Sequence, residues 1–419
     1  MNNEKICTEQ YVESDGKRLR CGFTTGSAAA MATVAALGGI LEGEFSEYVK
    51  ITTPKGWSAV SEVLDGKIIS ENSAIAAIKK DAGDDPDATD GIKIFSEVTV
   101  EKTDEKENGK CRIEITGGEG IGIVTKAGLD QPPGEYAINS VPRKMIEDEV
   151  RRTLGEHGGN FFVKVKISAE NGKEIAKNTF NPVLGIKDGI SILGTTGVVM
   201  PMSEEALVDS IYVEMKFLRS NFKSSVSGVI PLIVTPGNFG NDFLGNFPEL
   251  ENAPVIRCSN YIGKAIDFAC ELGFTHVLFV GHAGKFVKIA GGIMNTHSHN
   301  ADCRMEIIAC HASLARFESL TQTDIARIMN AATVDAALDI LDESDSSAAV
   351  CKSIAKAAEK HIARRSKGRF KFSFMMFSNT AGRGILSKSK NWDENANVVA
   401  QSLTGVPRRE SSDLIPPTV

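Results

Sequence analysis

The chain of 419 residues is long enough for two or three domains and for a large buried core, so it needs no disulfide or structural metal to fold. Hydrophobic residues make up 42% of the sequence, charged residues 24% and aromatic residues 6%, and the formal net charge is -7. These values are typical of a globular protein and argue against general nucleic-acid binding, which needs a basic face or aromatic stacking platforms.

Eight cysteines are scattered along the chain without a C-x-x-C pair, which argues against a zinc site or a redox motif and favours free thiols in a reducing cytosol. The first residues lack the apolar run of a signal peptide. The longest apolar stretch, residues 28–41, is too short to span a bilayer. We therefore expect a cytoplasmic protein without membrane or nucleic-acid partners.

The first half of the chain is punctuated by glycines, and its apolar segments are short. Residues 98–100, 113–115 and 161–167 are predicted to form strands. An alanine-rich helix is expected over residues 27–37, where two glycines stop it, and a second helix follows Pro142. This mixture indicates an α+β domain.

The second half alternates buried-strand runs with helices, after a long helix that begins near Ser203. This alternation predicts an α/β domain with a mostly parallel sheet. We place an α+β domain over residues 1–222, the α/β domain over 223–400 and a mobile tail over 401–419. The predicted strands are residues 229–234, 276–280 and 371–377; the predicted helices start at Ser259 and lie around 304–316, 324–341 and 348–365.

Three predicted strands of the second half end in loops rich in glycine, asparagine and threonine, at residues 237–238, 281–285 and 379–382. Ligands of open parallel sheets bind beyond the carboxyl ends of the strands, and glycine lets the backbone approach them closely. Each loop alone could be an ordinary tight turn. Three loops at equivalent positions favour a ligand site.

Lys285 lies in the second of these three loops. It is not a P-loop lysine, because Phe279 stands where that motif needs glycine and Phe286 replaces its Ser/Thr. Its charge suits a carboxylate-rich ligand, although a solvated surface lysine is an equal alternative. Farther along, His297 and His299 precede Asp302, a pattern that fits a metal site, a polar ligand contact or structural histidines.

Three other segments of the first half are open to two interpretations. The aspartates of residues 81–90 fail the EF-hand spacing and form either an acidic turn or a site for a cation or sulfonium. Thr24, Thr25 and Ser27 begin the alanine-rich helix and either bind an anion or simply cap it. Residues 117–122 miss the G-x-G-x-x-G pattern, so a dinucleotide site is disfavoured.

Taken in order, these loops resemble those of one family. Over about residues 18–385 the chain is similar to the CbiD family, the cobalt-precorrin-5B (carbon-1) methyltransferases of anaerobic cobalamin synthesis. The motifs that carry the resemblance are residues 20–27, 83–87, 120–126, 137–143, 190–197, 281–285 and 296–302.

The resemblance implies that S-adenosylmethionine donates a methyl group to carbon 1 of cobalt-precorrin-5B and gives cobalt-precorrin-6A. It implies a cobalt-tetrapyrrole substrate, no protein-bound metal, because the cobalt enters with the substrate, and a fold unlike the common class I methyltransferases. The sequence agrees on the fold, because the D/E-x-G-x-G-x-G loop of those enzymes is missing. A homo-oligomer is compatible with these properties.

The individual roles are our inference from residue type and position. The macrocycle carries many carboxylates, which basic residues would bind, and catalysis would mainly align donor methyl, ring carbon and leaving sulfur. His282 is a candidate for orienting the substrate, for axial contact with cobalt or for moving a proton. The expected catalytic residues are His282, Lys285, His297 and Asp302; the cofactor contacts are Gly237, Asn238, Gly281, Gly284, Gly194, Thr195, Thr196 and Gly197; the substrate contacts are Thr24, Thr25, Arg143, Lys126 and Arg304.

Two other functions are compatible with the same residues. A metal-dependent hydrolase would use His297, His299 and Asp302 as ligands, and would retain stoichiometric metal. A corrinoid-binding protein without catalytic activity would not bind S-adenosylmethionine.

Overall fold

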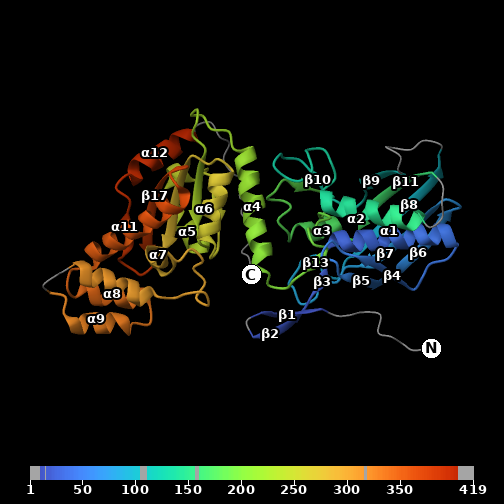
Figure 1. Ribbon diagram of the computed structural model, residues 1–419. Coiled ribbons are helices and arrows are strands. Elements are labelled where there is room, and N and C mark those ends of the chain that lie inside the picture. Colours follow the sequence, from blue (N-terminus) through green and yellow to red (C-terminus); the bar gives the residue numbers. More distant parts are fainter. Residues whose placement is uncertain (1–9, 15, 104–110, 156–159, 316–318, 404–419) are drawn as a thin grey trace. The chain divides into compact units, whose positions relative to one another are not determined.

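The computed structural model describes residues 10–14, 16–103, 111–155, 160–315 and 319–403 (Figure 1). The chain divides into two compact units, with the boundary between Glu204 and Glu205, and we call them unit 1 and unit 2.

This division lies earlier than the boundary expected at residue 222, because residues 205–221, which form nearly all of one helix, belong to unit 2. Ile211 and Met215 of this helix are buried in the core of unit 2. The tail expected over residues 401–419 lies outside the described residues from 404 onward. Residues 401 and 402 end the last helix of unit 2.

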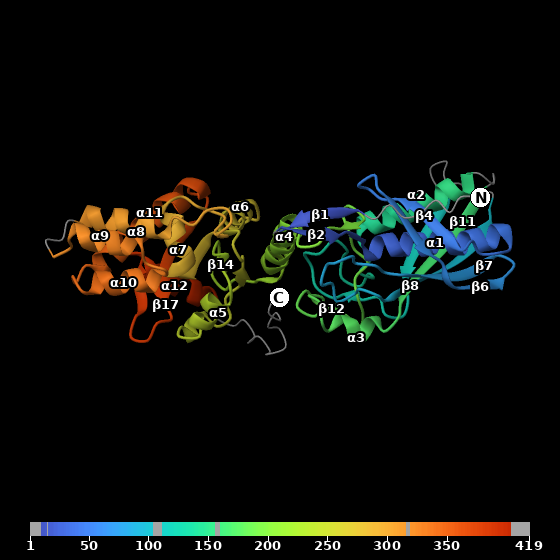
Figure 2. The same ribbon diagram turned by 90° about the horizontal axis from the view of Figure 1, so that it is seen from below.

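The core of unit 1 is a five-stranded sheet in the order β6-β7-β8-β11-β9. All neighbours pair antiparallel except β11 and β9, which are parallel. β8 and β11 are neighbours in this sheet (Figure 2), and buried residues alternate along both with residues that are half-buried or exposed, so one face is turned to the core. The strands are β6 (Leu64–Ser70), β7 (Ser73–Lys79), β8 (Lys93–Lys102), β9 (Arg112–Gly117) and β11 (Phe161–Ala169).

Two long helices of unit 1, α1 (Thr25–Glu42) and α2 (Ser140–Gly155), pack against each other, and α1 packs on β7 and β8. All six alanines of α1 are buried, and their small side chains let the helix lie close to the sheet. The hydroxyls of Thr33 in α1 and Ser96 in β8 are 2.9 Å apart and hydrogen-bond across this interface. Among the described helices, α1 alone is long and apolar enough to cross a membrane, but 67% of it is buried, as in a soluble protein's core helix.

Unit 1 also contains four short strand pairs and one short helix that lie outside the main sheet. Each pair is antiparallel. They are β1 (Tyr11–Ser14) with β2 (Lys17–Arg20), β3 (Gly22–Phe23) with β13 (Val198–Val199), β4 (Tyr48–Thr52) with β5 (Ser58–Glu62), and β10 (Ile123–Val124) with β12 (Ile186–Lys187); the helix is α3 (Gly172–Ala176).

Unit 2 is built on a second five-stranded sheet, in the order β15-β14-β16-β17-β18. The first four strands are parallel, in agreement with the predicted mostly parallel sheet, and β18 is antiparallel. Because β15 and β16 lie on opposite sides of β14, the strand order reverses between β14 and β16. The strands are β14 (Pro231–Thr235), β15 (Val255–Arg257), β16 (His276–His282), β17 (Lys371–Ser378) and β18 (Gly384–Lys388).

Helices cover both faces of this sheet, so its strands read as continuous apolar runs. Along β14, Leu232 and Val234 face a core shared with α6, α7 and α11, whereas Ile233 faces a core shared with α12 and η1. The helices are α4 (Glu204–Asn221), α5 (Asn238–Leu244), the 3₁₀ turn η1 (Pro248–Leu250), α6 (Ile262–Glu271), α7 (Ala283–Ala290), α8 (Arg304–Ala315), α9 (Gln322–Met329), α10 (Val334–Asp342), α11 (Ser347–Ser366) and α12 (Trp392–Ser402).

One predicted helix, over residues 324–341, is in fact two helices, α9 and α10. The hydroxyl of Thr333 accepts a hydrogen bond from the amide of Ala336, 3.1 Å away, and so caps the N-terminus of α10. A threonine inside the apolar pattern thus starts a new helix.

The packing of α7 on the sheet predicts that Gly281 is needed for stability. A Cβ atom there would lie 2.4 Å from the ring of Phe286, which is buried and stacked on Phe374, so the ring cannot move aside cheaply. We expect Gly281→Ala to lower the free energy of unfolding by about 1–3 kcal/mol. The matched control is Gly38→Ala in α1, where a Cβ meets nothing within 4 Å and alanine favours the helix.

Urea unfolding followed by circular dichroism measures both variants. Equal unfolding midpoints for Gly281→Ala and Gly38→Ala would contradict this packing argument.

Candidate functional site

The loops that follow β14, β16 and β17 lie at one edge of the sheet of unit 2, because these three strands are parallel neighbours. Their side chains touch. The ring of Phe239, just after β14, lies 5.9 Å from the ring of His282 at the end of β16, and His282 lies 5.7 Å edge-on from Phe377 in β17. This edge contains the point where the strand order reverses, the usual ligand position of open parallel sheets.

His282 is the N-cap of α7 at this edge. Its Nδ1 accepts a hydrogen bond from the amide of Gly284 at 3.1 Å, so the neutral ring carries its proton on Nε2. Burial lowers the pKa of His282, and the nearby charge of Asp335 only partly opposes this. At neutral pH the imidazole is therefore neutral and offers Nε2–H as a hydrogen-bond donor, which suits orientation of a ligand better than axial contact with cobalt.

Lys285 presents an ammonium group at the same edge. Its Nζ lies 4.0 Å from the position of a Cβ on Gly237 and 3.5 Å from the carbonyl oxygen of Ser259. Within the described parts of the chain, no acidic side chain forms an ion pair with Lys285. Burial lowers its pKa. Burial also raises the pKa of Cys258 to about 12, so the thiol stays protonated and does not neutralise Lys285.

The glycines predicted to contact the cofactor differ in their surroundings. Gly237 has a φ of 123°, a conformation that favours glycine, and only Lys285 lies near the position of a Cβ there. Gly281 is explained by its contact with Phe286, and Gly284 lies beside His282. Asn238 accepts a hydrogen bond from the guanidinium of Arg257 at 3.0 Å, which ties its side chain to β15.

The buried side chain of Lys288, which is only 3% exposed, holds the segment of residues 296–302 in place. Its Nζ donates hydrogen bonds to the carbonyl oxygens of Thr296 at 3.1 Å and Ala301 at 2.9 Å, and lies 3.8 Å from Asp302. Arg304 grips the carboxylate of Asp302 with two nitrogens, and this hydrogen bonding lowers the pKa of Asp302. Arg304, a predicted substrate contact, is thus already paired inside unit 2.

The two histidines of this segment lie against each other, with ring centroids 4.9 Å apart. The Nδ1 of His297 accepts a hydrogen bond from the amide of His299 at 3.3 Å. Over the residues that the structure describes, no group of three His, Cys, Asp or Glu side chains is close enough to hold a metal. The ligand set that a metal-dependent hydrolase would need is therefore not gathered there.

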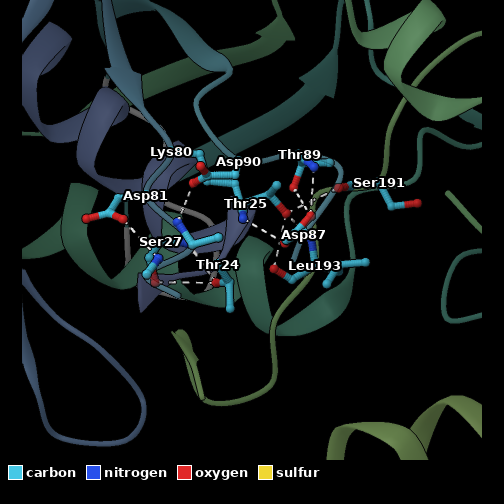
Figure 3. Close-up of polar contacts among 12 residues, drawn as sticks. Thr24, Thr25, Ser27, Lys80, Asp81, Asp87, Thr89, Asp90, Ser191 and Leu193 are labelled. Carbon is cyan, nitrogen blue, oxygen red and sulfur yellow. Dashed lines mark hydrogen bonds and ion pairs between the residues drawn. The ribbon is translucent and has the colours of Figure 1, made fainter. Parts of the chain in front are cut away.

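In unit 1, the start of α1 is closed by residues 191–197 (Figure 3). The hydroxyl of Thr25 accepts a hydrogen bond from the amide of Leu193 at 2.9 Å. The amide of Gly26 donates to the carbonyl oxygen of Leu193 at 3.0 Å. The hydroxyl of Thr24 caps the helix by accepting from the amide of Ser27 at 3.2 Å. Thr24 and Thr25 are buried, so capping and packing account for them without a bound anion.

The loop with Gly194 and Gly197 is predicted to contact the cofactor, but its glycines fit against α1. A Cβ on Gly194 would lie 2.3 Å from the hydroxyl of Thr24, and a Cβ on Gly197 would lie 2.9 Å from that of Ser27. Thr195 and Thr196 are exposed on the outer side of this loop.

Every aspartate of the 81–90 loop has a partner within unit 1. Lys80, which is almost fully buried, forms an ion pair with Asp87 at 2.7 Å. Arg20 holds Asp81 with both terminal nitrogens, and this hydrogen bonding lowers the pKa of Asp81. The remaining carboxylates accept from backbone amides: Asp84 from Arg20, Asp85 from Met202 and Asp90 from Ala82. The loop is an internally satisfied acidic turn.

The two other predicted substrate contacts of unit 1, Arg143 and Lys126, also contact neighbouring residues of this unit. The guanidinium of Arg143 donates to the carbonyl oxygens of Ile138 at 2.8 Å and Ile115 at 2.9 Å, and so joins α2 to β9. Lys126 is exposed, and its aliphatic chain covers Gly185.

A cavity of about 80 Å³ lies in unit 1. Ligand pockets for drug-sized molecules are roughly 300–1,000 Å³, so this cavity is too small for S-adenosylmethionine. Its lining includes Arg20, Cys21, Trp57, Lys80 and Asp81.

Sequence reasoning overlooked two residues that shape these sites, namely Phe239 and Arg257, and it considered Lys288 only as one of several cations that could bind substrate carboxylates. Phe239 directly follows Gly237 and Asn238, and an aromatic residue in a predicted ligand loop was a signal that could have been used. The contacts of Arg257 and Lys288 depend on the tertiary structure, and nothing local in the sequence indicates them.

Comparison with known proteins matches both halves of the chain to one family. The CbiD family matches residues 12–201, and the CbiD C-terminal domain matches residues 295–389. The cobalt-precorrin-5B C(1)-methyltransferase of Ruminiclostridium cellulolyticum is 46% identical over 374 residues, which cover 88% of this chain and 92% of that protein. The enzyme of the same name from Thermoanaerobacter sp. is 44% identical over 336 residues, 80% of this chain and 86% of that protein.

Among solved structures, the crystal structure of the cobalamin biosynthesis protein (cbiD) from Archaeoglobus fulgidus is 28% identical, with a TM-score of 0.36, and the match covers 70% of this chain and 87% of that one. The two relatives cover 88% and 80% of the chain at 46% and 44% identity, and the two family matches cover residues 12–201 and 295–389. The chain therefore belongs to the CbiD family.

Proposed function

We propose that this protein methylates carbon 1 of cobalt-precorrin-5B with S-adenosylmethionine and forms cobalt-precorrin-6A in anaerobic cobalamin biosynthesis. The observation that carries the proposal is the identity of 46% and 44% to two cobalt-precorrin-5B C(1)-methyltransferases along most of their length. The activity is a C-methyl transfer, and the cobalt belongs to the substrate.

The chemistry places modest demands on the protein. The bond between the methyl carbon and the sulfonium sulfur breaks as the bond from that methyl to carbon 1 forms, and S-adenosylhomocysteine leaves with the electron pair. The sulfonium is already a strong methylating agent, so the protein mainly aligns donor methyl, ring carbon and leaving sulfur. A protein-bound metal has no step to perform in this scheme.

We place the donor at the carboxyl edge of the unit 2 sheet, in contact with Gly237, Asn238, His282 and Lys285. Support comes from the reversal of strand order between β14 and β16 and from the ammonium of Lys285, which is half-buried and lacks an acidic partner among the described residues. The methionine part of the donor carries a carboxylate, which such an ammonium binds well. The Nε2–H of His282 offers a second polar contact.

The residues predicted to contact the macrocycle divide into residues with partners inside the protein and exposed residues. Thr24, Thr25 and Arg143 form hydrogen bonds within unit 1, and Arg304 pairs with Asp302 in unit 2. These residues would therefore act by shaping the loops. Lys126, Thr195 and Thr196 are exposed and could contact a carboxylate or an amide of the substrate directly.

Binding of S-adenosylhomocysteine tests both the donor site and the alternative of a corrinoid carrier. We expect the wild-type protein to bind it, and Lys285→Ala to weaken binding by about 1.5–3 kcal/mol, the range for a charged hydrogen bond. Lys264→Ala, an exposed lysine of α6 in the same unit, is the matched control and should bind normally. Isothermal titration calorimetry gives the three affinities.

Two results of this titration would count against the proposal. A wild-type protein that does not bind S-adenosylhomocysteine would favour a carrier without catalytic activity. Equal affinities of Lys285→Ala and Lys264→Ala would move the carboxylate of the donor away from Lys285.

The role of residues 296–302 can be tested with a chelator. Because Asp302 is paired with Arg304 and Lys288, we expect this segment to serve structure or ligand contact and not to hold a metal. Protein treated with a chelator and then freed of it should keep its rate of methyl transfer to cobalt-precorrin-5B. Activity that disappears and returns only with added zinc or iron would revive the metal site of His297, His299 and Asp302.

A further inference from the structure

Phe239 is a large apolar side chain that the fold leaves in solvent. It is 62% exposed and lies in the first turn of α5, two residues after Gly237. Most aromatic residues gain stability from burial, and an exposed ring at the ligand edge of a parallel sheet offers a flat apolar surface. The surroundings of the ring indicate what could cover it.

The position of Phe239 is set by a well-packed element, although its ring is exposed. Gly240, the next residue, brings α5 so close to the sheet that a Cβ there would lie 2.8 Å from the Cβ of Thr235. One turn later, Phe243 stacks on Phe377 of β17 with centroids 3.9 Å apart. These contacts hold α5 against the sheet, so Phe239 keeps its place at the edge.

Phe239 is the outer member of a row of three rings. His282 lies behind it at 5.9 Å with the ring planes inclined by 47°, and Phe377 lies behind His282 at 5.7 Å, almost perpendicular. His282 is half-buried and Phe377 is buried, so the free face of this row belongs to Phe239. Polar groups border the row, with the ammonium of Lys285 next to Gly237.

A ligand that fits this edge has a flat aromatic part and one anionic group. S-adenosylmethionine has both, in its adenine base and its carboxylate. The macrocycle is also flat, but its many carboxylates would need several cations. At this edge Arg257 already donates to Asn238, and Lys285 is the ammonium without an acidic partner among the described residues.

We infer that Phe239 is the surface on which the adenine base of the methyl donor stacks, with His282 supporting the ring from behind. This inference rests on the proposed function and on the donor site at the edge of the unit 2 sheet. It assigns to Phe239 a role in specificity, because stacking on Phe239 favours ligands with an aromatic base over ligands that lack one.

Two variants and one control test the stacking. Phe239→Leu keeps an apolar side chain but removes the ring, and Phe239→Tyr keeps the ring. Calorimetry should show S-adenosylhomocysteine binding about tenfold more weakly to Phe239→Leu, within the range for one stacked base, and nearly normally to Phe239→Tyr. Leu314→Ala removes another exposed apolar side chain of unit 2, at 66% exposure, and should not change the affinity.

A third variant reports the stacking directly. In Phe239→Trp, the indole would lie against the base, so adenosine and S-adenosylhomocysteine should quench its fluorescence, whereas methionine should not. The same titration of the wild-type protein corrects for its two natural tryptophans.

The results separate this inference from the proposed function. Equal affinity of wild type and Phe239→Leu for S-adenosylhomocysteine would overturn the inference and leave donor binding intact. The inference would also fall if Phe239→Leu raised the KM for cobalt-precorrin-5B without changing the donor affinity, because the ring would then serve the macrocycle. A wild-type protein that binds no S-adenosylhomocysteine would overturn the proposed function itself.

Discussion

Parallel pairing of β14 with β16, and of β16 with β17, determines where the chemistry of unit 2 can be placed. The register sets Pro231 opposite His276 and His276 opposite Lys371, so the three strands start level and their carboxyl ends meet at one edge. Both faces of these strands are covered by helices, which leaves their loops as the places for polar groups. The parallel pairing brings Gly237 to His282 and Lys285, although Gly237 is far from these two residues in the sequence.

Charge distinguishes this edge from the other polar clusters of the protein. In two of these clusters the buried lysines have partners: Lys80 pairs with Asp87, and Lys288 supports the loop that carries Asp302. Such groups are costly to bury unless they are paired, and removing either partner leaves an uncompensated charge. Lys285 differs, because burial lowers its pKa while no carboxylate of the described residues pairs with it. A ligand carboxylate would complete the pair.

Much of the architecture could be predicted from patterns in the sequence. Apolar runs that alternate with helices indicated the parallel sheet of unit 2, and the glycine-rich ends of its strands indicated the edge where β14, β16 and β17 meet. The antiparallel strand β18 and the break before Thr333 were overlooked, because a short mixed-polarity strand and a single capping residue leave weak local signals.

The use of individual polar residues was harder to predict, because it depends on tertiary contacts. Arg143 and Thr25 have the residue types of ligand contacts, yet they bind backbone carbonyls and amides brought to them by distant segments. Gly281 and Gly194 look like glycines that make room for a ligand, but each makes room for a neighbouring side chain. Composition and spacing do not distinguish these two cases. The atoms that a Cβ added at the glycine would meet in the folded chain do distinguish them.

The central claim is methyl transfer to one ring carbon, and the fate of a labelled methyl group tests it most directly. The protein would be incubated with cobalt-precorrin-5B and S-adenosylmethionine carrying a carbon-13 methyl group, and the isolated product examined by nuclear magnetic resonance. Our account predicts a single new methyl signal bonded to carbon 1, formed in step with S-adenosylhomocysteine. A ring that remains unlabelled, or a label on another carbon or on a nitrogen, would contradict it.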